Sequence, residues 1–165
     1  MTAITCILAP LSIPLPFSPV PISLTNLVIF ISVFILGMKD ATISFLIYLL
    51  LGAVGLPVFA SFHAGLSVLA GPTGGYLIGF IFLALIQGFA MKYFDRKLIP
   101  TIIGMLIGMA VCYIFGTVWL AKLMSLSFKE GLFMGVIPYL PGDAVKIIIA
   151  VIVGPKLYAA TKKVR

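Results

Sequence analysis

The sequence is poor in charge and above all in acidic residues. Only 9% of its 165 residues are charged, and Asp and Glu together number four, whereas soluble domains have about 25% charged residues. Hydrophobic residues make up 62% of the chain, against about 45–50% in soluble domains. This composition leaves too little polar surface to cover a soluble core. The sequence therefore predicts an integral membrane protein with a single domain over residues 1–165.

The residue types needed for several kinds of chemistry are also scarce. The chain has one histidine, and its two cysteines, Cys6 and Cys112, lie in separate apolar stretches without a CxxC or metal-ligand spacing. It contains no GxxxxGK[ST] loop for ATP. Its basic residues lie between apolar runs rather than on one polar face, which argues against a nucleic-acid partner. We expect no catalytic site, no metal and no cofactor, and membrane lipid as the surroundings.

Apolar runs separated by Pro, Gly or charged residues predict an all-α bundle of six transmembrane helices. The runs cover residues 1–10, 24–38, 41–55, 76–91, 99–120 and 143–160. A helix needs about 20 residues to cross a hydrocarbon core that is about 30 Å thick. Residues 1–10 are too few, so we expect the first helix to be truncated here or to begin upstream. Residues 133–140 are apolar but also too few to span.

The distribution of basic residues predicts the orientation of a multi-pass protein in the cell membrane. With the amino terminus in the cytoplasm, eight basic residues lie on the cytoplasmic side and three lie elsewhere. Cytoplasmic loops are enriched in Lys and Arg, so both termini are predicted to be cytoplasmic. The eight are Lys39, Lys92, Arg96, Lys97, Lys156, Lys162, Lys163 and Arg165, and the three are Lys122, Lys129 and Lys146.

This orientation places the unusual connections on the outer side. Residues 11–23, residues 55–75 and the stretch through residues 139–146 are apolar and rich in Pro and Gly, whereas the inner loops are short and charged. Long loops in a compact protein are usually lids or binding loops. The sequence therefore predicts a lidded pocket that faces outward.

Asp143 and Lys146 are the most informative charged residues. They stand at i and i+3 near the start of an apolar helix and therefore share one face. Ionisable residues in membrane helices normally face the bundle interior and mark function. One interpretation is a mutual ion pair, with Asp143 favoured by the positive amino end of the helix. The other is a binding site in which Asp143 accepts ligand N–H groups and Lys146 pairs with a ligand carboxylate.

Other polar or small residues have two interpretations each. The glycine-rich residues 71–75 precede a helix and either contact a ligand through backbone amides or form a tight re-entrant turn. Tyr76 either contacts a ligand or anchors the membrane interface. Asn26 is expected to face the pocket, Gln87 to make an interhelical hydrogen bond, and His63 to be a polar surface residue.

Small residues recur every fourth position in the fifth predicted span. They are Gly104, Gly108, Cys112 and Gly116. Such a stripe allows a second helix to approach closely. Packing within the bundle is the favoured interpretation, and docking to another subunit is the alternative.

Three motifs carry a resemblance to a known family. IPLPFSPVPISL, GLPVFA followed by GPTGGYLIGF, and PGDAVKIIIA occur in this order. Over residues 13–157 the chain resembles the BioY family, the biotin-binding S-components of energy-coupling factor (ECF) transporters. The resemblance implies a six-helix bundle that captures biotin at the outer face. The bundle would deliver biotin, as substrate rather than cofactor, through a module of one transmembrane scaffold subunit and two ATPase subunits.

The resemblance also implies roles for individual residues. Asp143 and Lys146 would be the polar pair that contacts biotin, and Gly74, Gly75 and Tyr76 would lie at the pocket wall. The first loop, with Phe17 and Pro21, would be the gate. The chain differs from the glycine-rich family pattern at Ser61, Phe62, His63 and Ala64. An apolar pocket with one acid and one base suits biotin, and we expect the pair to contact its two polar ends.

Three alternatives have distinct requirements. A related S-component would bind another small vitamin. An intramembrane enzyme needs a nucleophile–base pair or several metal-binding acids, and the sequence, with one histidine, argues against it. A structural membrane subunit would bind no ligand. Ligand binding by the purified protein separates the S-component interpretation from the last two.

Overall fold

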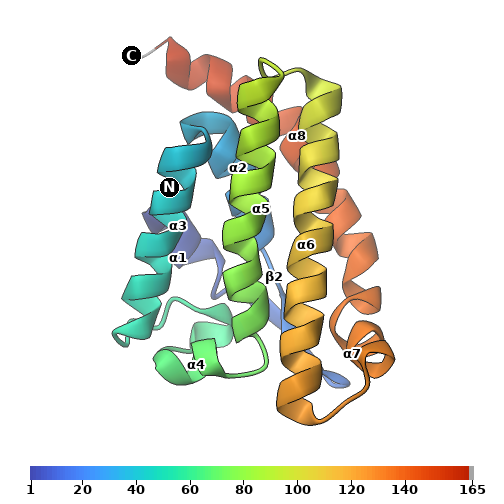
Figure 1. The fold of residues 1–165 in the computed structure, drawn as a ribbon. Helices are drawn as coiled ribbons and strands as arrows, with labels where there is room; N and C mark the ends of the chain where they lie inside the picture. Colours follow the sequence, from blue (N-terminus) through green and yellow to red (C-terminus); the bar gives the residue numbers. More distant parts are fainter. Residues whose placement is uncertain (164–165) are drawn as a thin grey trace.

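The computed structural model describes residues 1–163, which form a helical bundle with one β-hairpin (Figure 1). Long helices lie side by side, and short elements close one end of the bundle. In chain order the elements are α1 (Thr2–Leu8), β1 (Ser12–Leu15), β2 (Ser18–Ser23), α2 (Thr25–Leu36), α3 (Met38–Ala53), η1 (Ala60–Phe62), α4 (Leu66–Ala70), α5 (Gly74–Tyr93), α6 (Leu98–Met124), α7 (Phe128–Gly135), η2 (Ile137–Tyr139) and α8 (Leu140–Lys162). Val164 and Arg165, the end of the basic tail, lie outside the described residues.

The predicted helical membrane bundle is confirmed, although its helices differ in length. Among residues 1–163, three helical segments are long and apolar enough to cross a membrane: α5, α6 and the run Phe128–Lys162 that contains α8. The other three predicted spans are shorter, with 7 residues in α1, 12 in α2 and 16 in α3. At 1.5 Å per residue, α2 is about 18 Å long. It covers only part of a hydrocarbon core that is about 30 Å thick.

Helices α5 and α6 pack against each other along the small-residue stripe. A Cβ atom at Gly104 would lie 2.6 Å from the Cβ atom of Ala90, and one at Gly108 would lie 3.1 Å from the Cα atom of Leu83. Gly116 faces the ring of Tyr76 in the same way. Larger residues at these positions would push the two helices apart. The interpretation of the stripe as packing within the bundle is therefore confirmed.

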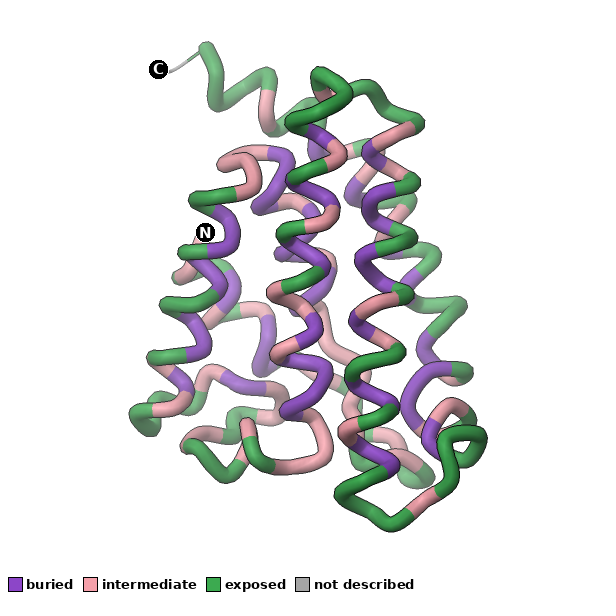
Figure 2. The backbone as a smooth tube through the Cα atoms, viewed as in Figure 1, coloured by how far each residue is buried: buried purple, intermediate pink, exposed green. Residues whose placement is uncertain are grey.

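Helix α2 occupies the centre of the bundle in spite of its length. Phe30 and Val33 are fully buried, and Figure 2 shows buried stretches on the inner sides of the helices around it. The side-chain amide of Gln87 on α5 donates a 3.1 Å hydrogen bond to the carbonyl oxygen of Phe30. The predicted interhelical hydrogen bond of Gln87 is confirmed. On the opposite side, Gly154 of α8 lies directly against the ring of Phe34.

The hairpin and α7 were not predicted as regular elements. The first loop forms two antiparallel strands in which Ser12 pairs with Ser23, and Ile13 with Ile22. Its prolines argue against a central strand, but each strand here has only one neighbour, so proline on the free side breaks no ladder. Helix α7 begins with a capping box in which Ser127 and Glu130 exchange hydrogen bonds.

The two ends of the bundle differ in character. The turn between α5 and α6, the α2–α3 junction and the end of α8 lie at one end, and the hairpin tip, α4 and α7 lie at the other (Figure 1). At the first end, Arg96 donates a 2.7 Å hydrogen bond to the carbonyl oxygen of Phe34 and stacks 3.8 Å from the ring centre of Tyr158. The basic loops are thus separated from the Pro- and Gly-rich connections, as the sequence predicts.

Candidate substrate-binding site

A cavity of about 380 Å³ lies under the hairpin, among α2, α3, α5, α6 and α8. Small-molecule sites typically measure about 300–1,000 Å³ and combine an apolar wall with a few polar groups. The apolar lining includes Phe59, Leu77, Phe80 and Met109. Four polar residues from three helices meet at its α8 side: Asn26, Tyr113, Asp143 and Lys146, which we call the Asp143 cluster.

Asp143 lies in the first turn of α8 and is 7% exposed. Its Oδ1 atom accepts hydrogen bonds from the side-chain amide of Asn26 and from the ammonium group of Lys146, both at 2.8 Å. Its Oδ2 atom accepts the hydroxyl proton of Tyr113. Hydrogen bonds to an ionised group are stronger than those between neutral groups. Donors from α2, α6 and α8 therefore hold this carboxylate in one orientation.

Lys146 lies one turn further along α8 and is 8% exposed. Its Nζ atom donates to Asp143 at 2.8 Å and to the carbonyl oxygen of Ser23 at 2.7 Å. The mutual ion pair is therefore present, and it is the one salt bridge found within residues 1–163. Because Ser23 ends β2, the same lysine also connects the ion pair to the hairpin.

Asn26 and Tyr113 complete the cluster. Asn26 is buried and lines the cavity at the start of α2, on the side of the pocket where it was expected. Tyr113 was missed by the sequence reasoning. It stands in the middle of α6, whereas tyrosines of membrane helices are enriched at the two interfaces. A buried tyrosine hydroxyl usually finds a hydrogen-bond partner, so its mid-helix position was the available signal.

Comparisons with known proteins agree on one family. The BioY family model matches residues 1–163. This chain belongs to the BioY family. A probable biotin transporter BioY of Pyrococcus horikoshii is 35% identical over 162 residues, which cover 96% of this chain and 92% of that protein. The biotin transporter BioY of Thermotoga maritima is also 35% identical, over 88% of this chain and 85% of that protein.

A solved structure extends the BioY match to three dimensions. The crystal structure of the S-component for biotin from an ECF-type ABC transporter matches with a TM-score of 0.86 and 32% sequence identity. The match covers 94% of this chain and 85% of that chain. The helical bundle is therefore that of a BioY protein.

The glycine-rich motif of the BioY family contributes to the cavity differently from the expectation. Tyr76 lines the cavity, but Gly74 and Gly75 are not among its lining residues. A Cβ atom at Gly74 would collide with the backbone of Leu69, and one at Gly75 would lie 2.7 Å from the Trp119 ring. Both glycines therefore serve close packing of α5. The residues that precede them, 71–73, line the cavity instead.

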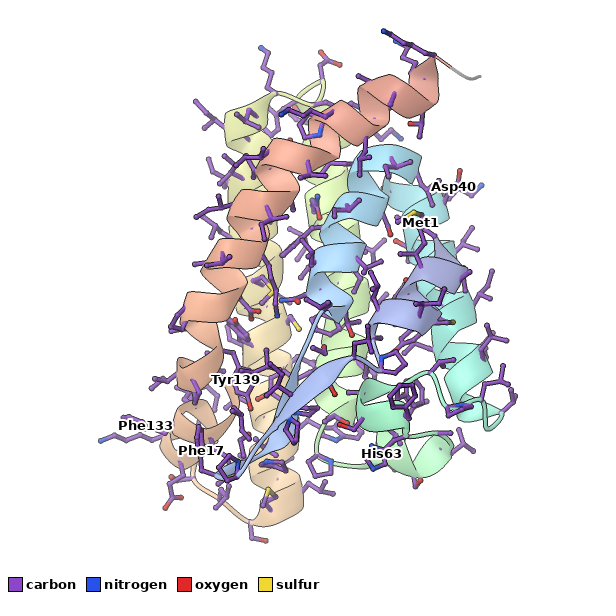
Figure 3. All side chains as sticks on the ribbon, turned by 180° about the vertical axis from the view of Figure 1, so that it is seen from behind. Met1, Phe17, Asp40, His63, Phe133 and Tyr139 are labelled. Carbon is purple, nitrogen blue, oxygen red and sulfur yellow. The ribbon has the colours of Figure 1, made fainter. Side chains whose placement is uncertain are left out.

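The two predicted gate residues of the BioY loop also occupy different places. Pro21 on β2 lines the cavity. Phe17 lies at the hairpin tip, 59% exposed, and not among the cavity-lining residues. Figure 3 shows it near Phe133 of α7, and the two residues line a separate shallow depression. The body of the hairpin, rather than its aromatic tip, covers the cavity.

A closed ring of hydrogen bonds attaches β2 to η2. The backbone N–H of Val20 donates to the Ser18 hydroxyl at 3.1 Å, and that hydroxyl lies 2.7 Å from the hydroxyl of Tyr139. Tyr139 in turn donates to the carbonyl oxygen of Val20. The Tyr139 hydroxyl is the donor in both contacts, and because a phenol has one proton, Ser18 and the Val20 carbonyl oxygen share it.

The other side of the hairpin is attached to η1. The Ser12 hydroxyl accepts a 2.8 Å hydrogen bond from the backbone N–H of Ser61. Ser61 and Phe62 have φ angles of 57° and 60°, a left-handed conformation that glycine adopts most easily. The stretch that differs from the glycine-rich BioY pattern therefore keeps a conformation typical of glycine. His63, which follows, is exposed as predicted, and it also lines the cavity.

The packing role expected of the cysteines is seen at Cys112. Cys112 is fully buried, and its Sγ atom would lie 2.9 Å from a Cβ atom at Gly79. Cys6 and Cys112 are not joined. Among residues 1–163, no group of three or more His, Cys, Asp or Glu side chains is placed to hold a metal ion.

Proposed function

We propose that this chain is a biotin-binding S-component. It captures biotin at the outer face of the cell membrane and delivers it through an ATP-driven module of one scaffold subunit and two ATPase subunits. The observation that carries the proposal is the BioY family match over residues 1–163. A structural match to the S-component for biotin from an ECF-type ABC transporter supports it. The chain is a transporter subunit, and its site binds and releases a ligand without chemical conversion.

The cavity end of the bundle is the proposed outer end. Seven of the eight basic residues counted on the cytoplasmic side lie in segments at the opposite end of the bundle (Figure 1), and the eighth, Arg165, lies outside the described residues. Lys146 was counted among the three others, but it is buried at the cavity. Removing Lys146 from the count increases the excess of basic residues on the cytoplasmic side over those in the outer loops. Both termini are therefore proposed to be cytoplasmic, with the hairpin facing outward and lipid around the bundle.

The hydrogen bonds of the Asp143 cluster indicate which part of biotin it binds. A carboxylate has about four acceptor positions and an ammonium group has three donors. Asp143 uses two positions on Oδ1 and one on Oδ2. Lys146 uses two of its three donors. One acceptor on Asp143 and one donor on Lys146 remain. A ligand with a neighbouring donor and acceptor can fill both positions. In a ureido ring, an N–H group would donate to Asp143 and the C=O group would accept from Lys146.

The charge of the pair favours the same part of the ligand. Asp143 neutralises Lys146 at 2.8 Å, so a ligand carboxylate would approach a neutral pair rather than a free cation. A neutral ureido group would meet no net charge. We therefore propose that Asp143 and Lys146 bind the ureido ring together. This replaces the expectation, drawn from their helical spacing, that they contact the two ends of biotin.

The hairpin is the proposed gate. Pro21 covers the cavity, and Phe17 rests beside α7 at the hairpin tip. Tyr76 is a proposed residue of the pocket wall. Gly74 and Gly75 are proposed to shape the pocket indirectly, because their close packing sets the position of α5. Lys146 donates to both Asp143 and the carbonyl oxygen of Ser23 at the end of β2. A ligand that binds Lys146 is therefore connected to the hairpin through this lysine.

The experiment that tests the proposal identifies the bound ligand. The chain is expressed alone in cells supplied with biotin, purified, and analysed by mass spectrometry for retained small molecules. Retained biotin in a 1:1 ratio supports the proposal. Retention of another vitamin would identify a related S-component instead. A protein that retains nothing and also fails to bind added biotin would fit a structural subunit.

A further inference from the structure

Tyr48 on α3 has a feature that the proposed function does not use. Its side chain is fully buried and lines the cavity, yet its hydroxyl has no hydrogen-bond partner among the described residues. Buried polar groups are almost always paired, because an unpaired one loses its hydration without compensation. A free hydroxyl at a cavity wall is therefore a group that a ligand can satisfy.

Aromatic packing fixes the position of this hydroxyl. The ring centre of Tyr48 lies 5.4 Å from that of Phe45 and 5.6 Å from that of Phe59, which it meets edge to face. Such aromatic pairs have preferred geometries. The packing therefore fixes the ring and the oxygen atom of Tyr48 before a ligand binds.

Neighbouring residues at the start of α2 connect the Tyr48 hydroxyl with the Asp143 cluster. Thr25 lies beside the phenol and also lines the cavity. Thr25 accepts a 3.0 Å hydrogen bond from Ser23, whose carbonyl oxygen binds Lys146. The next residue, Asn26, donates to Asp143. Tyr48 is thus linked through the start of α2 to the groups that are proposed to bind the ureido ring.

We propose that Tyr48 donates a hydrogen bond to the ureido carbonyl oxygen of biotin and determines specificity for that oxygen. A carbonyl oxygen has two lone pairs. In the proposed function Lys146 occupies one of them, and the Tyr48 hydroxyl occupies the second. A site with a hydrogen-bonding group for a ligand atom discriminates strongly against analogues that lack it. This inference rests on the proposed binding of biotin and adds a contact from α3 that no sequence motif indicated.

Two other buried side-chain hydroxyls without partners fit this role less well. The Tyr76 hydroxyl lies against Gly135 of α7. Thr117 is fully buried with an unpaired hydroxyl but is not among the cavity-lining residues. Thr117→Val therefore serves as a control, because it removes another buried hydroxyl without a partner at a residue that does not line the cavity.

The test measures affinities of the purified chain for biotin and for 2-thiobiotin, in which a weakly accepting sulfur replaces the ureido oxygen. Tyr48→Phe should weaken biotin binding about tenfold, the effect of an ordinary neutral hydrogen bond. The same variant should change 2-thiobiotin binding less than about threefold, because the sulfur accepts a weaker bond. Thr117→Val should leave both affinities unchanged. Thermal unfolding without ligand should show neither variant less stable than the wild-type protein.

The outcomes separate this inference from the proposed function. Unchanged biotin affinity in Tyr48→Phe would overturn the inference and leave the proposed function intact. Equal losses for the two ligands would also overturn it, since they would indicate a general change in cavity shape. A wild-type protein that binds neither ligand would remove the proposed function and the inference together.

Discussion

At the scale of single residues, the central feature is a charged pair held inside an apolar bundle. Burying two charges costs more than their attraction returns unless further hydrogen bonds compensate. Here Asn26 and Tyr113 bond Asp143, and the carbonyl oxygen of Ser23 bonds Lys146. One acceptor position on Asp143 and one donor on Lys146 still have no hydrogen-bond partner among the described residues. We interpret these two remaining positions as the ones that a ligand occupies.

The proposed roles predict how Lys146→Ala acts on two ligands. Binding of biotin should weaken by about 2–5 kcal/mol, because the variant leaves a buried carboxylate without its cation. Biotin amide, which keeps the ureido ring but carries no carboxylate, should lose a similar amount. Isothermal titration calorimetry on both ligands measures the two changes. A loss confined to biotin itself would contradict the ureido assignment and restore Lys146 as the partner of the ligand carboxylate.

Sequence reasoning could find part of this site for a physical reason. Asp143 and Lys146 were identified because charge inside an apolar run is costly and therefore informative. Their partners could not be assigned from spacing, since Asn26 is 117 positions and Tyr113 is 30 positions away from Asp143 in the sequence. The proposed ureido assignment also depends on the ion pair between Asp143 and Lys146, which only the structure shows. Helical spacing alone shows only that they share a face.

At the scale of elements, the hairpin is the part of the molecule best placed to move. Each strand pairs only with the other. Hydrogen bonds to the Tyr139 hydroxyl, to the Lys146 ammonium group and to the Ser61 backbone connect the hairpin to the bundle. A cover that is fastened by a few hydrogen bonds can open without disturbing the helices. The sequence predicted a loop here because residues 11–23 form a Pro-rich connection between two apolar runs. The prediction missed that an isolated hairpin leaves free edges on which proline is tolerated.

Tyr139→Phe tests this view of the hairpin. The variant removes the hydroxyl that links Ser18 to the carbonyl oxygen of Val20, so β2 should open more readily. Biotin dissociation should accelerate about fivefold, as expected for the loss of about 1 kcal/mol. Stopped-flow release of a labelled biotin measures the rate. As a control, Thr161→Val removes a hydroxyl near the opposite end of α8, and it should leave the rate unchanged. An unchanged dissociation rate in Tyr139→Phe would indicate that the hydrogen bonds of the Tyr139 hydroxyl do not hold the hairpin closed.

At the scale of the whole molecule, composition and charge were sufficient for much of the architecture. The excess of apolar residues predicted a helical membrane bundle, and the basic loops do lie together at one end (Figure 1). The lengths of α2 and α3 were less predictable, because hydrophobicity marks where a span lies and not where the backbone leaves the helix. The chain contains no GxxxxGK[ST] nucleotide-binding loop, which agrees with the proposal that separate ATPase subunits supply the energy.

Single-cysteine labelling tests the proposed orientation. Lys129→Cys and Lys163→Cys are introduced separately into a background in which Cys6 and Cys112 are replaced. A membrane-impermeant thiol reagent applied to intact cells should label position 129 and not position 163, because α7 lies at the cavity end and α8 ends at the basic end. Labelling of position 163 alone would invert the topology and place the cavity in the cytoplasm.

Biotin binding to the purified chain, in the absence of any other subunit, tests the central claim most directly. Calorimetry should show saturable 1:1 binding for the wild-type protein. Asp143→Asn should weaken it by at least about tenfold, because the variant replaces an ionised acceptor by a neutral amide in a buried site. Wild-type protein that binds no biotin, or an Asp143→Asn variant that binds it as tightly as wild type, would contradict the account.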